Sequence, residues 1–476
     1  MPAIPNFLGG SYTAQSALVD QERTVNMYLE RAEAPGATAR TALYPIPGFR
    51  VSSTGTTGFG RAHFATGGRE FCIIGTDFIE INQFGVRTSR GTVAIDGNPA
   101  TISSTGDAGG ELFITSGGNG YIFTLATNVL AAVANLAGLA DMGESIDGYF
   151  LALDVSASTI YISDLLDGTT WDLTNYIQRS AAPDPWVAIK VSSKYLYFLG
   201  SQTSEVWYNA GTFPIPFQPH PSGFMNYGCT APWSAEVVGS TVCWLGATIN
   251  GTGMVMRAAG LNPEDISTYA TQYAFDQMID TADAIGDSYT DRGHTFYVLT
   301  FGDGNATWCW DEQTQVWAER GHLNELTNAY DAWRPLYHVF AFGQHRVLDA
   351  KGADVYEMSP DFYTDIDGTS GIRWVRRAPS IVNENKYIKY NTFELDMEVG
   401  LGATTGQGSE PAVMMRMSND GGKTFGNEQW RSGGKRGEYG ARVRWTRCGS
   451  ARKRVYEVSG SDPIPFRLLG AWQELG

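Results

Sequence analysis

A strand-turn-strand unit returns along most of the chain, and this repeat restricts the fold more than any other feature of the sequence. Between about residue 70 and residue 358, an apolar strand repeatedly leads into a turn with Gly, Asp or Ser and then into a second aromatic or β-branched strand. Examples are "REFCIIGTDFIEI", "GELFITSGGNGYIFTL", "KYLYFLGSQTSEVWYNA" and "HTFYVLTFGDGNATWCWD". Such units begin roughly 40 to 50 residues apart, the period of four-stranded propeller blades. The pattern therefore predicts a β-propeller of six or seven blades.

Composition agrees with an all-β fold. The chain has 476 residues with 56 Gly, 13 Trp, 23 Tyr and 23 Phe, which suits many short strands joined by tight turns.

Two segments interrupt the repeat. Residues 260–286 are expected to be helical in part, with Asn262 or Pro263 able to start a helix and Gly286 able to stop it. The Ala-rich residues 125–143 are expected to form a β linker between blades rather than a helix.

We predict three parts along the chain. Residues 1–50 form an N-terminal arm and first strands that join the propeller or the platform, residues 51–378 form the propeller, and residues 379–476 form a small antiparallel β-sandwich platform. The last boundary rests on a change in charge sign and on a new alternating strand that starts at Tyr387.

Charge divides the chain in the same place. Residues 373–476 hold 17 Lys and Arg against 11 Asp and Glu, a net charge of +6, whereas residues 1–372 hold 17 against 39, a net charge of −22. Two readings of the basic residues stay open, a solvated strand face and a docking surface for an acidic protein or nucleic acid. The docking candidates are Arg431, Lys435, Arg436, Arg442, Arg444, Arg447, Arg452, Lys453 and Arg454.

The stretch "SNDGGKTFG" (418–426) resembles two motifs. A phosphate-binding loop is excluded because the glycine that it needs five residues before Gly422 is Met417. The Asp-box pattern S-x-D-x-G-x-T-[WF] is met at every position, by Ser418, Asp420, Gly422, Thr424 and Phe425. Since this pattern specifies a turn and supplies no nucleophile, we expect a structural role.

Catalytic motifs were sought without success, so we expect no enzyme and no cofactor. The chain has no G-x-S-x-G and no H-E-x-x-H, and its six histidines are dispersed. Its five scattered cysteines include no C-x-x-C and are expected to be reduced core thiols. "DIDGTSGIRWVR" begins like a calcium loop, yet its twelfth position is Arg376, so a turn is expected instead of a metal site. No signal peptide or membrane-spanning run is evident, and no membrane insertion is expected.

Paired carboxylates keep one enzymatic alternative open. Acidic neighbours such as Glu264 and Asp265 could serve glycoside hydrolysis if folding set them across a cleft. An Asp-box propeller that acts as a glycosidase or binds carbohydrate therefore remains the alternative hypothesis. A sialidase-like enzyme would need several arginines converging in the central pocket, and those of residues 1–372 are few and dispersed.

Several stretches along nearly the whole length carry a resemblance to one family. They are "RTVNMYLE" (23–30), "LYPIPGF" (43–49) and "SEVWYNAG" (204–211) and, strongest after Tyr387, "MRMSNDGGKTFGNEQW" and "GARVRWTRCGSARKRVYEVSGSDPIPFRLLGAWQEL". With these stretches the chain resembles the packaged-DNA stabilisation proteins of short-tailed bacteriophages, also called tail hub or nozzle components.

This resemblance implies a non-enzymatic protein of the virion tail, made in the host bacterial cytoplasm. Six copies would close a ring beneath the portal and its adaptor protein, retain the packaged DNA until ejection, and bind a needle or fibre protein below. Double-stranded DNA would pass without sequence-specific contact. An acidic wall would let a polyanion slide past without the salt-dependent adhesion that lysines cause.

Overall fold

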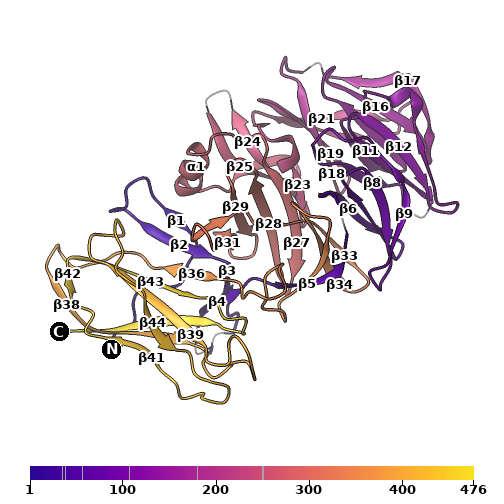
Figure 1. The fold of residues 1–476 in the computed structure, drawn as a ribbon. Helices are drawn as coiled ribbons and strands as arrows, with labels where there is room; N and C mark the ends of the chain where they lie inside the picture. Colours follow the sequence, from indigo (N-terminus) through magenta and orange to yellow (C-terminus); the bar gives the residue numbers. More distant parts are fainter. Residues whose placement is uncertain (35, 38, 56, 107, 180, 249–250) are drawn as a thin grey trace.

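The chain folds into a β-propeller followed by a β-sandwich (Figure 1). The structure is a computed structural model that describes residues 1–476 except 35, 38, 56, 107, 180 and 249–250. Within the described residues the propeller consists of seven blades, each with four main antiparallel strands. The predicted all-β architecture of propeller and sandwich is confirmed, and the blade number is the higher of the two expected.

The first four blades follow the sequence repeat without interruption. Their strands are β6 (Gly60–Thr66), β7 (Arg69–Ile74), β8 (Asp77–Ile81) and β9 (Arg87–Thr92); β10 (Thr101–Ser104), β11 (Glu111–Ser116), β12 (Asn119–Thr124) and β13 (Val129–Ala132); β14 (Met142–Ile146), β15 (Tyr149–Asp154), β16 (Thr159–Asp164) and β17 (Asp167–Gln178); and β18 (Trp186–Ser192), β19 (Tyr195–Gly200), β20 (Ser204–Asn209) and β21 (Phe217–Met225).

The last three blades carry additional elements. Their strands are β23 (Glu236–Val238), β24 (Thr241–Thr248), β25 (Gly251–Ala259) and β26 (Asn262–Asp265), with β22 (Gly228–Cys229) beside β24; β27 (Ile285–Asp291), β28 (His294–Phe301), β29 (Ala306–Asp311) and β30 (Val316–Arg320); and β33 (Pro335–Ala341), β34 (Gln344–Asp349), β35 (Val355–Ser359) and β5 (Gly48–Ser53). A small hairpin of β31 (His322–Asn324) and β32 (Ala329–Asp331) lies between the sixth and seventh blades.

Aromatic side chains fill the spaces between blades, as the high aromatic content predicts. Phe113 of the second blade packs against Phe150 and Trp171 of the third, with ring centroids 5.4 and 5.2 Å away. The ring is closed by strands far apart in sequence: β33 of the last blade lies against β6 of the first, and β5 pairs with β35 as the outer strand of the last blade. All five cysteines are buried and free.

The expected helix forms within residues 260–286, but it starts and ends at other residues than predicted. Asn262 and Pro263 lie in β26, and the helix α1 runs over Tyr269–Asp276. Thr268 caps it, because the Thr268 hydroxyl accepts a hydrogen bond from the Thr271 N–H while the Thr271 hydroxyl accepts one from the Thr268 N–H. Gly286 lies in β27 and does not end the helix. The Ala-rich segment forms β13, the short 3₁₀ turn η1 (Ala134–Leu136) and the start of β14, without an α-helix.

The sandwich has two sheets with a cluster of buried apolar side chains between them. One sheet contains β2 (Gln21–Val25), β36 (Trp374–Arg377), β43 (Lys453–Gly460), β39 (Ala412–Ser418) and β40 (Gln429–Ser432), with β1 (Tyr12–Thr13) and β37 (Ile381–Val382) at its margins; the other contains β3 (Met27–Arg31), β4 (Thr41–Pro45), β44 (Leu468–Leu475), β38 (Ile388–Met397), β41 (Val443–Thr446) and β42 (Ser450–Ala451). Phe393, Trp445 and Tyr456 stack in the core between the sheets.

Strand β2 joins the two halves. It pairs in parallel with β30 of the sixth blade and antiparallel with β36 of the sandwich, so that one sheet of 11 strands runs from the propeller axis into the sandwich. The Arg23 guanidinium donates to both carboxylate oxygens of Glu319 on β30, at 2.7 to 3.0 Å. The fully buried Arg376 donates to the carbonyls of Phe7 and Gly10 and pairs with Glu22.

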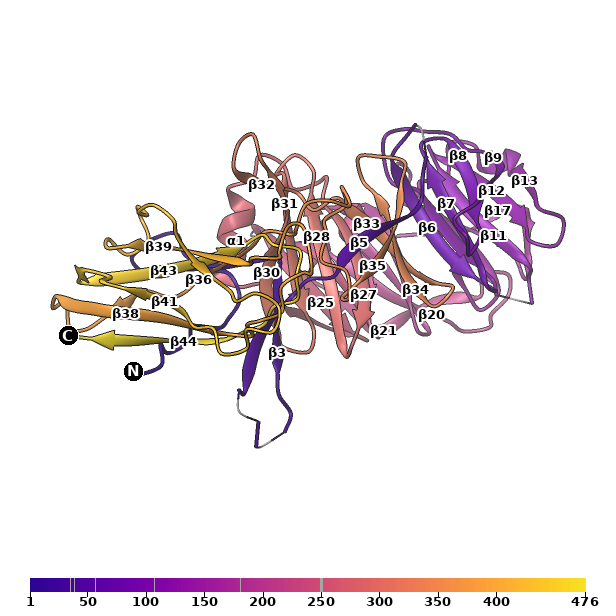
Figure 2. The same ribbon diagram turned by 60° about the horizontal axis from the view of Figure 1, so that its bottom comes forward.

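The residues expected to form an arm therefore contribute to both halves. After β2, the hairpin of β3 and β4 completes the second sandwich sheet and projects from the molecule (Figure 2), and the chain then enters the propeller as β5. Strand β3 of the hairpin is fastened to the sixth blade by His294, which is 3% exposed and binds Glu30 (2.9 Å) and Asp311 (2.8 Å). Burial lowers the pKa of His294, but the two carboxylates outweigh it and raise this pKa to about 9.

We predict that the contribution of His294 to the unfolding free energy is lost at alkaline pH. Since the folded-state pKa is raised from an ordinary value of 6.5 to about 9, the stabilisation is fully present below pH 6.5 and disappears as pH rises through about 9. It amounts to roughly 3 kcal/mol at most, at about 1.4 kcal/mol per pKa unit. We expect the difference in unfolding free energy between the wild type and His294→Gln, from urea titrations, to shrink between pH 6 and pH 9.5. A pH-independent difference would contradict this account.

Candidate functional site

The basic C-terminal run does not form a single surface, because β41 divides it. Lys435, Arg436 and Arg442 lie before this strand, and Arg447, Arg452 and Lys453 follow it. The second group lies near β42 and the two chain ends, at the end of the sandwich farthest from the propeller (Figure 1). Burial alternates within β41, where Val443 and Trp445 are buried and Arg444 and Thr446 are more exposed.

Arg454 must be removed from the docking candidates. It is 0% exposed, its guanidinium donates to the Cys448 carbonyl at 2.7 Å, and it lies 4.5 Å from the ring centroid of Tyr390. The prediction treated the three consecutive basic residues 452–454 as surface, but in a strand alternate side chains point to opposite faces, and β43 turns Arg454 inward.

Other candidates are engaged with acidic residues of the sandwich itself. Arg442 makes a bidentate ion pair with Glu394, Lys435 pairs with Glu410 at 2.6 Å, and Arg444 approaches Glu474 at 3.5 Å. Arg431 donates hydrogen bonds to the carbonyls of Trp430 and Arg444. Arg436 is exposed and has no ion pair within the described part of the chain.

Four basic side chains near β42 form no ion pair among the described residues. We call them the distal basic tip: Lys389, Arg447, Arg452 and Lys453. The backbone brings them together, because Lys389 pairs with Ser450 and the Arg447 N–H donates to the Asn391 carbonyl. Arg452 lies 4.6 Å from the ring centroid of Tyr387, which is 69% exposed. Lys389 and Tyr387 were missed because they precede the basic run by more than 40 residues, and only strand pairing makes them neighbours.

The Asp-box residues form the predicted turn. Ser418 is 1% exposed; its hydroxyl donates to Asp420 (2.6 Å) and accepts from the Gly422 N–H (2.8 Å). The carboxylate of Asp420 accepts from the N–H groups of Lys423 (2.9 Å) and Thr424 (3.0 Å) and from the Thr424 hydroxyl (2.6 Å). Gly422 has φ +96°, a conformation that favours glycine. Desolvation opposes ionisation of Asp420, but these hydrogen bonds dominate and hold its pKa below the ordinary value.

Phe425, the last residue of the motif, lies between two guanidinium groups. The Arg377 and Arg416 guanidiniums are 4.8 and 4.9 Å from its ring centroid, and both arginines pair with the buried Glu457. The motif thus supports a sandwich hairpin through backbone hydrogen bonds and cation–π contacts.

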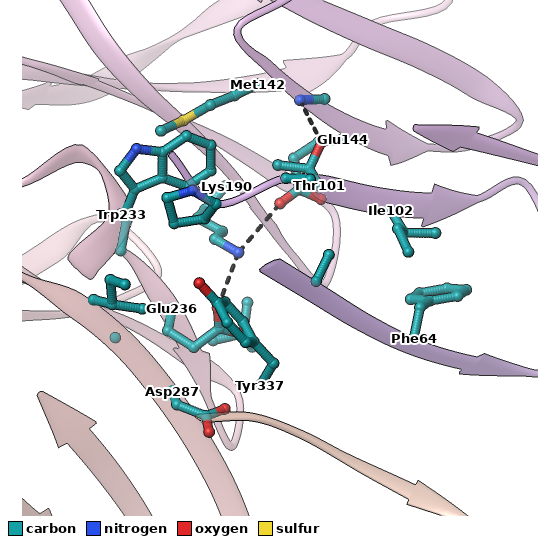
Figure 3. A pocket seen from close by; sticks show the side chains of 18 of the residues that line it. Phe64, Thr101, Ile102, Met142, Glu144, Lys190, Trp233, Glu236, Asp287 and Tyr337 are labelled. Carbon is teal, nitrogen blue, oxygen red and sulfur yellow. Dashed lines mark hydrogen bonds and ion pairs between the residues drawn. The ribbon is translucent and has the colours of Figure 1, made fainter. Parts of the chain in front are cut away.

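The central tunnel of the propeller is the other candidate site (Figure 3). It is a cavity of about 310 Å³ lined by the inner strands of the blades. Lys190 of β18 lies between two acids, with its ammonium 3.0 Å from Glu236 of β23 and 3.5 Å from Glu144 of β14. Burial disfavours the Lys190 charge, but the two carboxylates outweigh it and keep its pKa above the ordinary value.

One ammonium cannot neutralise every acid in the tunnel. Burial raises the pKa of Glu144, the more distant partner of Lys190, to about 7. Burial likewise raises the pKa of Asp287 to about 7, although its carboxylate accepts hydrogen bonds from the N–H groups of Ser288 and His338. In the described part of the chain the tunnel lining includes no arginine, so the convergence on which a sialidase-like site depends is not met there.

The tunnel is too small to be a DNA path. The major groove of a duplex alone is about 12 Å wide and about 8.5 Å deep. The whole duplex is wider than its groove, so it does not fit into a cavity of about 310 Å³ that is crossed by the Glu144–Lys190–Glu236 ion pairs. The inner strands of three adjacent blades are instead linked by these charges.

No metal centre is evident among the described residues, where no group of three or more His, Cys, Asp or Glu side chains is placed to hold an ion. The calcium-like segment is a turn: the Asp367 carboxylate accepts from the N–H groups of Thr369 and Ser370, and Asp365 binds His322 at 2.7 Å. Over the same residues, no helix is long and apolar enough to cross a membrane.

Two models of one protein family match the chain. Residues 3–363 match the model described as "Bacteriophage P22 Gp10, beta-propeller", and residues 373–473 match "Bacteriophage P22 Gp10, beta-sandwich". A search of curated proteins returned no significant match.

Solved structures give only distant similarities. PorZ, a surface component of the type-IX secretion system of Porphyromonas gingivalis, is 11% identical with a TM-score of 0.38; the aligned region covers 73% of this chain and 44% of PorZ. BamB from Moraxella catarrhalis is 13% identical with a TM-score of 0.39, covering 70% and 97%. The extracellular domain of BT4673 from B. thetaiotaomicron is 10% identical with a TM-score of 0.41, covering 87% and 58%.

The Asp-box geometry predicts a structural effect of mutation. Ser418→Ala removes the acceptor of the Gly422 N–H and the donor to Asp420, and we expect it to cost about 1–3 kcal/mol of unfolding free energy in urea titrations. Lys423→Ala in the same loop is the control and should change stability by less than about 0.5 kcal/mol, since this side chain is exposed. Equal effects of the two substitutions would contradict the assigned role of Ser418.

Proposed function

The chain belongs to the bacteriophage P22 Gp10 family of phage stabilisation proteins, and we propose that it serves in the virion as the tail hub. In this role it forms a ring below the portal and its adaptor protein, closes the tail channel, retains the packaged DNA and lets it pass during ejection. A needle or fibre protein binds below the ring.

The observation that carries the proposal is the agreement between family and architecture. Both family models match, in the order propeller then sandwich, and together they span nearly the whole chain. A structural role also fits the residues, because the conspicuous motif of the sequence forms a turn and the tunnel acids are tied to Lys190 and to backbone N–H groups. The alternative of an Asp-box glycosidase gains no support from this arrangement.

The DNA path in this proposal lies between copies of the protein. A single propeller offers only its small tunnel, so a channel for a duplex has to be enclosed by several subunits. A head-to-tail ring leaves a central opening and needs interfaces of well over about 1,000 Å² each. Residues 1–372 carry a net charge of −22, and a wall of that sign repels phosphates and lets the duplex slide.

The distal basic tip is the part of the sandwich that we assign to the portal adaptor. Its cations lack acidic partners within the described chain and lie at the end of the molecule opposite the acidic propeller. An acidic surface of a partner can therefore approach them without being repelled by the propeller. Tyr387 adds an exposed aromatic ring to the same surface.

The tail-hub role predicts how particles behave. Quantitative mass spectrometry of purified virions should find about six copies of the chain per particle, the number that the resemblance to tail hub proteins implies for the closed ring. Particles assembled without the protein should package DNA and then lose it, which is seen as empty heads in electron micrographs. Virions that lack the chain, or particles that retain their DNA without it, would contradict the proposal.

The docking assignment predicts a position-dependent effect of charge reversal. Arg447→Glu with Arg452→Glu should reduce incorporation into particles at least tenfold, since two attractive contacts become repulsive. Lys435→Glu with Arg436→Glu, on the other side of β41, changes the net charge equally and should leave incorporation near the wild-type level. Incorporation is measured by immunoblot of purified particles, and both variants are first checked for an unchanged melting temperature. If both pairs reduce incorporation equally, general charge and not the tip is responsible.

A further inference from the structure

A groove of about 810 Å³ opens where a turn of the third blade meets the fourth blade. Its floor and walls come from the start of β19, the end of β20 and the middle of β21, and its far side is the turn between β14 and β15. These turns lie at the surface of the propeller, so the groove is separate from the central tunnel and from the distal basic tip. The tail-hub function proposed above assigns no role to it.

Three rings form the walls of the groove. His220 lies with its ring centroid 5.8 Å from that of Tyr208 and 6.2 Å from that of Tyr195, both in edge-to-face arrangements. All three side chains are partly exposed. The Nδ1 atom of His220 accepts a hydrogen bond from the Ser222 N–H at 3.2 Å, so that in the neutral ring the proton is on Nε2, which is left as a donor. The result is an aromatic surface with a hydrogen-bond donor in it.

Polar groups surround these rings and are held in fixed positions. The Asn209 side chain donates to one carboxylate oxygen of Asp147 at 3.0 Å and accepts from the Gly211 N–H at 3.0 Å. The second Asp147 oxygen, the Lys194 ammonium and the hydroxyls of Tyr195 and Tyr208 have no hydrogen-bond partner within the described residues. They are therefore available to a ligand.

The loop beside the groove is ordered by its own hydrogen bonds. The Ala210 N–H donates to the Pro216 carbonyl at 2.8 Å, and the Thr212 hydroxyl donates to the Ile215 carbonyl at 2.6 Å. A ligand would consequently meet a groove that is already formed, and little binding energy would be spent on ordering it.

We propose that this groove binds a saccharide. The carbon-bound hydrogens on one face of a sugar ring pack against aromatic faces, while its hydroxyls donate to carboxylates and accept from ammonium, imidazole and phenol groups. The groove supplies both kinds of partner at once. Its formal charges, Asp147 and Lys194, cancel, and this favours an uncharged polyhydroxyl ligand over a polyanion such as nucleic acid or over a strongly charged peptide. The ligand class is thus a neutral oligosaccharide, of one to a few sugar units in contact.

The proposal is tested with the full-length protein and defined probes. Saturation-transfer difference NMR is recorded with maltohexaose, chitohexaose and a delipidated neutral bacterial O-polysaccharide, and affinity for the best probe is then measured by titration calorimetry. We expect saturation transfer to at least one of the three. His220→Ala and Asp147→Asn should each weaken binding roughly tenfold, because one contributes a wall and the other an acceptor of sugar hydroxyls. Asp147 has φ +50°, and asparagine tolerates this conformation, so the second variant keeps the turn.

Two controls separate recognition in the groove from other effects. Tyr269→Ala removes an aromatic ring that is 84% exposed on α1, outside the groove, and should leave affinity unchanged. Melting temperatures of all variants within about 2 °C of the wild type exclude unfolding as the cause of weaker binding. The proposal is overturned if none of the three saccharides receives saturation transfer, or if the groove variants bind as tightly as the wild type. Binding of a polyanion such as heparin in preference to the neutral probes would also overturn it.

Discussion

Strand β2 is the element on which the arrangement of this molecule depends, because it is hydrogen-bonded on both sides by different halves of the fold. On one side it meets β30, the outer strand of the sixth blade, and on the other it meets β36 of the sandwich. The ion pair of Arg23 with Glu319 and the buried Arg376, which ties the N-terminal residues to the sandwich, hold this strand in place. Separating the two halves at this strand would break these pairs and leave the buried Arg376 charge uncompensated, which is costly.

Because both halves are fastened to one strand, the oppositely charged parts of the chain stay apart and can bind other molecules. The acidic propeller and the basic end of the sandwich are held at opposite ends of an elongated body (Figure 1). If the two halves could fold back on one another, their opposite charges would pair within one chain. Held apart, they are available to other molecules, and the stabilisation family to which the chain belongs is one whose members act in a larger particle. The tunnel contributes to stiffness as well, since its ion pairs connect three blades.

Sequence reasoning succeeded where the determining interactions are local. The blade repeat is set by turns and strands of neighbouring residues, and the Asp-box turn by hydrogen bonds among residues 418–424, so both could be read from short stretches. The approximate presence of α1 followed from local composition, but its start did not, because Asn262 and Pro263 are drawn into β26 by pairing with β25. The capping box of Thr268 and Thr271 was a visible signal that was not used.

The errors at the candidate docking surface have a nonlocal cause. The burial of Arg454 depends on the carbonyl of Cys448 and on the rings of Tyr390 and Tyr456, which strand pairing brings around it. The same pairing adds Lys389 to Arg447 and Arg452 at the tip, and separates Lys435 and Arg436 from them. The distribution of the first 50 residues over both sheets of the sandwich and the last blade could not be derived from their sequence either, since it depends on partners more than 300 residues away.

The late pairing of β5 has a consequence for how the chain is made. On the ribosome this strand emerges early, but its partner β35 is synthesised only some 300 residues afterwards, and the bridge between Ala3 and Trp472 forms later still. Until then six blades stand as an open arc with an unpaired edge, a state prone to association with other nascent chains. Both halves therefore stay incomplete until β35 and Trp472 have been made, and a product that stops before them lacks the strands that close the fold.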